Sequence, residues 1–177
     1  MSGVGVNDLA RASLLFTPLL AGFALNGVCI KTGILRALAR PLDGGARWRG
    51  RRVFGDSKTW RGVVVVALGT GLGFLALHGK WLGLGVLVGT AAMLAELPNS
   101  FCKRQLDIAP GRQAGGAAAV LFHVLDQVDV VAGAWLVLWL VVPPTAGLVL
   151  ASLAFVFVTH QLMTVVGYAL GMRATWR

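Results

Sequence analysis

Five apolar segments, each long enough or nearly long enough to cross a lipid bilayer, dominate this chain. A helix needs roughly 20 apolar residues to span about 30 Å of hydrocarbon. Only 13% of the 177 residues are charged and the mean hydropathy is +0.76, which excludes a soluble globular domain. The sequence therefore predicts a single all-α polytopic membrane domain, residues 1–177, with five transmembrane helices. The spans are expected at about 14–30, 62–77, 82–97, 120–142 and 146–170.

Lysine and arginine are distributed unevenly between the two sides of these spans. Residues 31–61 hold nine of them, residues 98–119 hold three and the tail after the last span holds two, whereas only Arg11 and Lys80 lie on the other side. Under the positive-inside rule, this bias predicts an external N-terminus, two long cytoplasmic loops and a cytoplasmic C-terminus in a cell-membrane protein. The net charge of +9 borders the bilayer, so it indicates phosphorylated lipid or nucleotide as a partner and not nucleic acid.

A basic, glycine-punctuated element lies between the first two spans, at residues 51–62. Its twelve residues contain one carboxylate, two hydroxyls, four cationic side chains and two glycines. This mixture favours phosphate chemistry at a membrane surface, since helix packing in lipid does not require it. The alternative is that the basic residues only fix the orientation of the helix and touch anionic head groups.

Three carboxylates fall within or at the ends of the expected spans. Glu96 closes the third span, and Asp126 and Asp129 lie three residues apart, on one face of the fourth. Carboxylates gathered in a low dielectric repel one another unless a cation neutralises them, and hard oxygen ligands suit Mg²⁺. The alternative for any one of these acids is an ion pair with Lys103 or Arg104.

Glycines and a proline raise further expectations. The G-x-x-x-G spacings at 69/73 and 85/89 predict close helix packing. If the third helix continues past Pro98, Glu96 and Ser100 lie one turn apart on the same face. The glycine-rich segment 110–116 fits either a cover over a site or a plain linker.

Four elements of the sequence, taken in order, resemble the motifs of a known family. They are Phe54-Gly55-Asp56-Ser57-Lys58-Thr59-Trp60-Arg61-Gly62, Ser100-Phe101-x-Lys103-Arg104, Leu125-Asp126-Gln127-Val128-Asp129, and His160 with Tyr168-x-x-Gly171-x-x-x-x-Trp176. The chain resembles the CDP-archaeol synthase family, which is related to the phosphatidate cytidylyltransferases, from about Asn26 to Trp176. The family generally has Gly-Asp where this chain has Ala95-Glu96.

The resemblance implies a magnesium-dependent enzyme with five transmembrane helices and a site on the cytoplasmic side. The reaction would transfer CMP from CTP to a phosphorylated lipid, either phosphatidic acid or an ether-lipid phosphate, with release of pyrophosphate. Catalytic roles are expected for Lys58, Arg61, Lys103, Arg104 and Asp126. Metal coordination is expected from Asp126 and Asp129 with Glu96, and substrate contacts from Asn26, Gly55, Asp56, Thr59, Gly62, Ser100 and His160. For His160, a structural hydrogen bond across helices is the alternative to lining the site, and it is favoured over proton transfer.

Two alternative functions remain open at this point. Glu96 in place of an aspartate is compatible with a non-catalytic lipid-binding homologue. A small cation transporter would use Asp126, Asp129 and His160 as a polar path, but its acids would be spread across the depth of the membrane. The sequence does not predict the oligomeric state.

Overall fold

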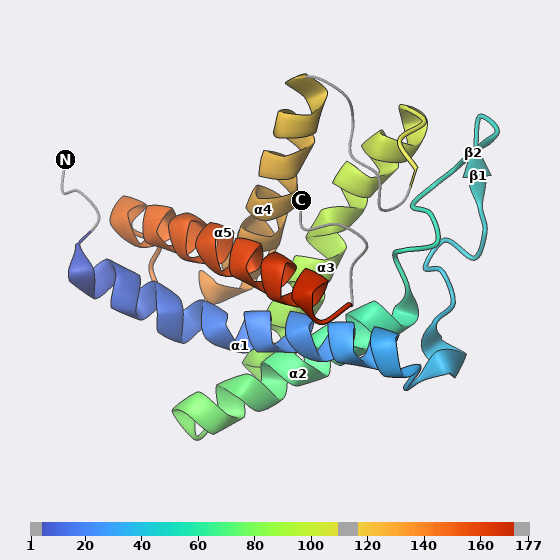
Figure 1. The fold of residues 1–177 in the computed structure, drawn as a ribbon. Coiled ribbons are helices and arrows are strands. Elements are labelled where there is room, and N and C mark those ends of the chain that lie inside the picture. The colour runs from blue at the N-terminus through green and yellow to red at the C-terminus, as the bar shows by residue number, and fades with distance from the viewer. Residues whose placement is uncertain (1–4, 110–116, 172–177) are drawn as a thin grey trace.

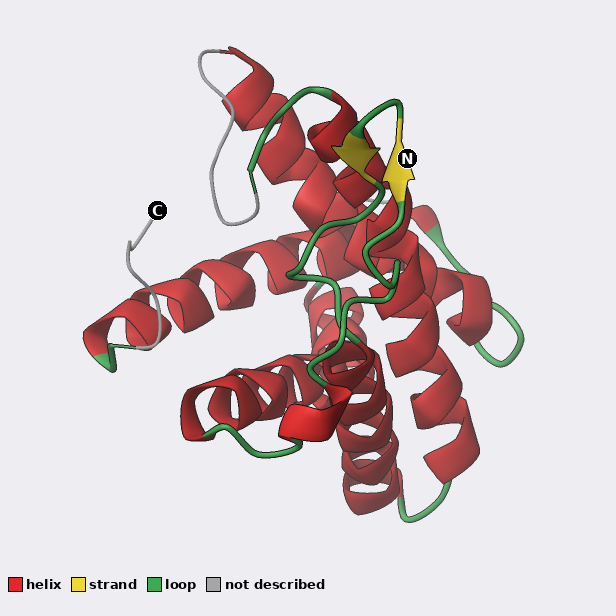
Figure 2. Ribbon diagram, turned by 90° about the vertical axis from the view of Figure 1, so that its right-hand side faces the viewer, coloured by secondary structure: helices red, strands yellow, loops and turns green. Residues whose placement is uncertain are grey.

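The computed structural model describes residues 5–109 and 117–171, which form five long helices and a short hairpin (Figures 1 and 2). All five helices are long and apolar enough to span a membrane, in agreement with the all-helical multi-pass architecture that the sequence predicts. The helices are α1 (Val6–Thr32), α2 (Trp60–His78), α3 (Leu82–Gln105), α4 (Ala117–Leu138) and α5 (Ala146–Ala169). Between α1 and α2 lie the 3₁₀ helix η1 (Arg36–Leu38) and the antiparallel strands β1 (Arg47–Trp48) and β2 (Arg51–Arg52).

The helix ends differ from the ends of the apolar segments. α1 begins at Val6, before the apolar run, and α3 continues through Pro98 to Gln105, whereas α4 ends at Leu138. Proline removes one backbone hydrogen bond but does not end this helix. Ser100, Lys103 and Arg104 therefore lie on the same helix as Glu96, at its end.

α3 lies between α2 and α4 in the helix bundle. α2 packs against both α1 and α3, and α3 packs against α4, whereas α5 lies along α1 (Figure 1). The hairpin lies beside the C-terminal end of α3 (Figure 1). The start of α2, the C-terminal half of α3 and the middle of α4, which carry the predicted polar residues, are thus brought together.

Glycines allow the close approach of these helices. A Cβ atom on Gly69 would lie 2.9 Å from the Cα of Gly22, and one on Gly85 would lie 2.8 Å from the Cα of Gly71. The prediction that the G-x-x-x-G glycines serve packing is confirmed. Gly133 performs the same role between α4 and α3, because a Cβ there would meet the backbone of Ala91 and Ala92.

Two sequence predictions fall outside the described residues. These are the glycine-rich cover or linker at residues 110–116 and the terminal Trp176 of the last motif. Tyr168 and Gly171 of that motif are described, and Tyr168 is 46% exposed near the end of α5.

We predict that Gly133→Ala destabilises the protein by about 1–3 kcal/mol, since the new methyl group overpacks the α3–α4 contact. Thermal unfolding of the purified protein in detergent measures this effect. The matched control is Gly83→Ala, where a Cβ meets nothing within 4 Å. Equal unfolding temperatures for the two variants would contradict the close α3–α4 contact.

Candidate active site

A buried carboxylate organises the basic loop, defined here as residues 33–59. The Asp43 side chain is only 1% exposed and accepts a 2.8 Å hydrogen bond from the guanidinium of Arg52. It also accepts backbone N–H bonds from Phe54 at 2.9 Å, Gly55 at 3.1 Å and Gly45 at 3.0 Å. Burial raises the pKa of Asp43, but these hydrogen bonds outweigh it and hold the pKa well below its usual range. The carboxylate therefore stays ionised and closes the loop.

Further contacts bring the loop back to the start of α2 and to the end of α3. The N–H of Leu42 donates to the carbonyl of Lys58 at 2.8 Å, and the N–H of Trp60 donates to the carbonyl of Arg40 at 3.1 Å. On the other side, Arg51 forms a salt bridge with Asp107, just beyond α3. The residues just before α2 are thus fixed in space and not merely tethered.

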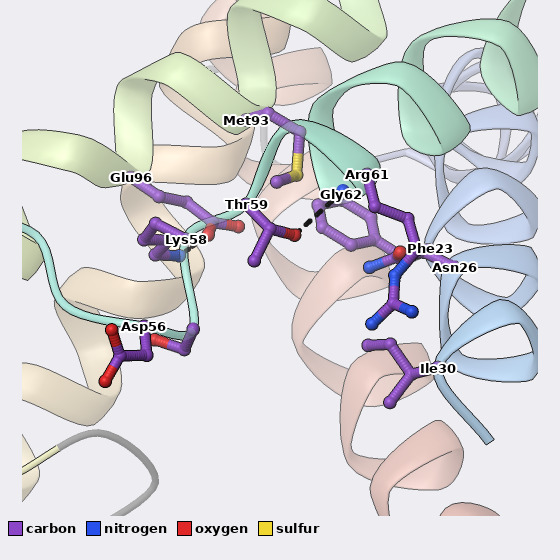
Figure 3. Close-up of a pocket in the computed structure, with 11 residues that line it drawn as sticks. Phe23, Asn26, Ile30, Asp56, Lys58, Thr59, Arg61, Gly62, Met93 and Glu96 are labelled. Atoms are coloured by element: carbon purple, nitrogen blue, oxygen red, sulfur yellow. Dashed lines mark hydrogen bonds and ion pairs between the residues drawn. The ribbon is translucent and has the colours of Figure 1, made fainter. Parts of the chain in front are cut away.

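These contacts place the basic element at a cavity of about 360 Å³ (Figure 3). Loop residues, α1, α2 and α3 all contribute to its wall. The lining side chains include Lys58, Thr59, Arg61 and Asn26 on the polar side and Phe23, Ile30 and Met93 on the apolar side. Asp56, Ser57, Gly62 and Glu96 complete the lining, so seven predicted site residues share one cavity.

Thr59 and Gly62 give α2 its start at the cavity. The Thr59 hydroxyl caps the helix by accepting the N–H of Gly62 at 3.2 Å. A side chain on Gly62 would meet Met93 and Thr59. Gly55, at φ +87°, turns the chain where a Cβ would be strained, and its N–H donates to Asp43.

An ion pair joins the loop to the bundle. The ammonium of Lys58 contacts the carboxylate of Glu96 on α3, and both side chains are less than one fifth exposed. The negative charge of Glu96 is therefore paired with the positive charge of Lys58, and Figure 3 shows the two side chains next to each other. Asp56, in contrast, is 73% exposed and pairs with Arg52 at 2.6 Å.

A second polar cluster lies between α3 and α4. The amide of Asn99 donates to Asp126 at 2.8 Å and to Asp129 at 3.1 Å, and Lys103 forms an ion pair with Asp126 at 2.5 Å. The expected alternative of an ion pair with Lys103 is therefore observed for Asp126. Asn99, which the sequence analysis did not single out, is the residue that joins the two aspartates.

Several predicted residues carry buried polar atoms without a hydrogen-bond partner among the residues described. They are Oδ1 of Asn26, Nε of Arg61, and Nε and Nη1 of Arg104, together with Oδ1 of Asn99. Buried polar groups are nearly always paired, so such a concentration is typical of a ligand site. Arg104 itself is 9% exposed, near Ser100, which is 8% exposed on the same helix.

The three carboxylates expected to bind metal make different contacts. Glu96 pairs with Lys58 at the cavity, whereas Asp126 and Asp129 accept hydrogen bonds from Asn99. Across the described residues, no set of three His, Cys, Asp or Glu side chains is arranged to hold a metal ion. Asp126, Asp129 and the unpartnered Oδ1 of Asn99 nevertheless supply hard oxygen donors at one place. This donor set fits Mg²⁺, which commonly binds one or two carboxylates plus substrate phosphates and water.

His160 lies on α5 and is not among the residues that line the cavity. Its Nδ1 accepts a hydrogen bond from the amide of Gln127 on α4 at 2.9 Å. The structure thus connects His160 to the helix that carries the aspartates and not to the cavity.

Comparison with known proteins identifies the family. Residues 19–177 match the family model described as CarS-like CDP-archaeol synthase. The chain belongs to this family. It is 33% identical over 152 residues to the CDP-archaeol synthase of Methanosphaerula palustris, covering 75% of this chain and 87% of the relative. It is 37% identical over 162 residues to that of Halobacterium salinarum, covering 79% and 84%.

A solved structure also resembles this CarS-like protein. It is described as an intramembrane enzyme for archaeal membrane lipids biosynthesis. The two match with a TM-score of 0.66 and 25% sequence identity, over 89% of this chain and 94% of the other. The family resemblance inferred from the motifs is confirmed.

We predict that Asp43→Asn loosens the basic loop, because an amide cannot hold Arg52 and the backbone donors as a carboxylate does. Hydrogen exchange at Phe54 and Gly55 should quicken by about tenfold or more. Since the folded-state pKa of Asp43 is depressed, the wild-type loop keeps this stabilisation at neutral pH and loses it only as strong acid protonates the carboxylate. Asp8→Asn, in the first turn of α1 and outside the loop, is the control, and unchanged exchange in Asp43→Asn would contradict this role.

Proposed function

We propose that this protein is a CTP-dependent cytidylyltransferase, which transfers CMP from CTP to a phosphorylated membrane lipid and yields a CDP-lipid and pyrophosphate. The observation that carries the proposal is the cavity where Lys58, Thr59 and Arg61 meet apolar side chains of α1 and α3. Such a cavity suits a ligand with a charged head and an apolar tail. Relatives named CDP-archaeol synthase support the same reaction.

The reaction forms one phosphorus–oxygen bond and breaks another. A non-bridging oxygen of the lipid phosphate attacks the α-phosphorus of CTP, and the bond from that phosphorus to the oxygen of the β-phosphate breaks. The lipid phosphate is already ionised at neutral pH, so no protein nucleophile is needed. Catalysis must therefore bring two anions together, hold them in line and neutralise the leaving pyrophosphate.

The lipid phosphate fits the side of the cavity that faces α1. Phe23 and Ile30 line this side, and Ile30 is 56% exposed on the outer surface of the helix, so an acyl or ether chain can leave the cavity along apolar surface. Arg61 carries an unpartnered Nε–H at this position, which would donate to a phosphate oxygen, whereas the unpartnered Oδ1 of Asn26 can only accept a hydrogen bond. Lys58, beside Glu96, supplies the positive charge between the two substrates.

The nucleotide phosphates fit the second cluster. We assign Asp126 and Asp129, with Oδ1 of Asn99, to hold Mg²⁺, and Lys103 and Arg104 to bind the triphosphate, with Ser100 as a hydroxyl donor. The bound cation would act as a Lewis acid on the phosphoryl oxygens and as a template. When Lys103 binds phosphate, Asp126 loses its present ion-pair partner and its charge becomes available to the metal. Glu96, one helical turn from Asn99, completes the negative charge of this region.

The charge distribution supports the same orientation for the whole site. Fourteen of sixteen lysines and arginines lie in segments on one side of the spans, which we propose is the cytoplasmic side of the cell membrane, with the N-terminus outside. CTP is then available from the cytoplasm. A transporter is not favoured, because the described carboxylates of the site gather at one place, where Lys58, Lys103 and Asn99 hold them, and do not follow one another across the bundle.

The first test measures incorporation of label from CTP into chloroform-soluble product by purified protein. Phosphatidic acid and an ether-lipid phosphate are offered in parallel, with and without chelator. We expect label in at least one lipid, abolished by chelator, and about 100-fold less with Asp126→Asn. Asp8→Asn, a carboxylate in the first turn of α1 that does not line the cavity, should retain activity. No label in either lipid from folded protein would favour the non-catalytic lipid-binding homologue.

The second test separates the two substrate positions. Arg61→Gln removes a cation from the α1 side of the cavity, so the KM for lipid phosphate should rise by about tenfold or more while the KM for CTP changes little. Lys103→Gln should show the opposite pattern, because Lys103 lies in the second cluster. Equal effects of both variants on both KM values would contradict the assignment of the two positions.

A further inference from the structure

Two hydrogen bonds between histidine and glutamine join α4 to α5. The amide N–H of Gln127 on α4 donates to Nδ1 of His160 on α5 at 2.9 Å. The amide N–H of Gln161 on α5 donates to Nε2 of His123 on α4 at 2.8 Å. Each helix therefore contributes one histidine and one glutamine, in a reciprocal arrangement.

These residues occupy a different face of α4 from the aspartates of the site. His123 and Gln127 are four residues apart, so they share one face, which is directed toward α5. Asp126 precedes Gln127 and points about 100° away around the helix, toward Asn99 of α3. α4 is thus held on one face by α5 and presents its carboxylates on another face to α3.

The packing of α5 gives these hydrogen bonds a specific task. α5 makes its larger contact with α1 and a much smaller one with α4 (Figure 1). α4 also packs closely along α3 at Gly133, so the distance between those two helices is set there, and the two directional hydrogen bonds to α5 add a constraint on the rotation of α4 from its other side. Gln127 is 5% exposed, in a segment where a polar side chain without a partner is costly.

We propose that Gln127 and His160, supported by His123 and Gln161, are positioning residues that fix the rotation of α4. Their hydrogen bonds hold Asp126 and Asp129 against Asn99, in the arrangement that the metal-bound nucleotide requires. The catalytic consequence rests on the proposed function, but the effect on the rotation of α4 does not. The hydrogen bond from Gln127 agrees with the expected structural hydrogen bond of His160 across helices, and direct contact of His160 with substrate stays a prediction.

The kinetic test compares Gln127→Leu with the exchange variant Gln127→His/His160→Gln. We expect Gln127→Leu to lower kcat by about tenfold and to raise the Mg²⁺ concentration for half-maximal activity, with the KM for lipid phosphate unchanged. The exchange variant, which can rebuild a histidine–glutamine pair, should recover most of both losses. Ser152→Ala is the control, because the Ser152 hydroxyl bonds only within α5, to Leu148.

If these residues only stabilised the fold, Gln127→Leu would lower the unfolding temperature but would leave the Mg²⁺ concentration for half-maximal activity unchanged. The exchange variant would then not restore kcat. That outcome would overturn the proposal.

A second measurement does not depend on catalysis. Nitroxide labels on two exposed residues, Leu87 of α3 and Leu121 of α4, report the rotation of α4 against α3 in a background without Cys29 and Cys102. We expect a broader or shifted distance distribution in Gln127→Leu and a near wild-type distribution in the exchange variant. An unchanged distribution in Gln127→Leu would refute the positioning role even if the wild-type protein proved to be inactive.

Discussion

The ion pair between Lys58 and Glu96 is the contact on which the arrangement of the site depends. It joins the basic loop, which is polar and would not pack on apolar helices by itself, to α3, which lies between α2 and α4. Desolvating two charges is costly, and a buried pair offsets that cost only with good geometry and additional hydrogen bonds. The network around Asp43 supplies this geometry, since it holds the loop so that Lys58 meets α3.

α3 serves as a wall shared by two groups of polar side chains. Glu96, Asn99 and Lys103 follow one another along one face of α3, where Glu96 contacts Lys58 of the loop, and Asn99 and Lys103 contact Asp126 of α4. A cavity with an apolar side and a carboxylate cluster therefore lie next to each other on one helix. This adjacency suits a reaction between an amphiphile and a nucleotide, because each substrate meets its own chemistry while the two phosphates come together.

The sequence predicted the helices and the basic element better than it predicted the contacts between them. Hydropathy indicated five spans, and the residues from Gly55 to Gly62 were recognised because their composition does not suit lipid. Asp43, Asn99 and Gln127 were missed, since their importance comes from partners 9 to 33 residues away that only folding brings near. For the same reason, the sequence did not indicate the ion pair of Glu96 with Lys58, and the shared role of Glu96, Asp126 and Asp129 in metal binding stays a prediction.

The position of the transferred phosphorus tests the central claim most directly. Purified protein is incubated with a lipid phosphate and with CTP labelled either at the α-phosphate or at the γ-phosphate. Cytidylyl transfer predicts that the α-label enters the lipid and that the γ-label is released as pyrophosphate. Entry of the γ-label into the lipid would indicate phosphoryl transfer by a kinase, and it would contradict the account.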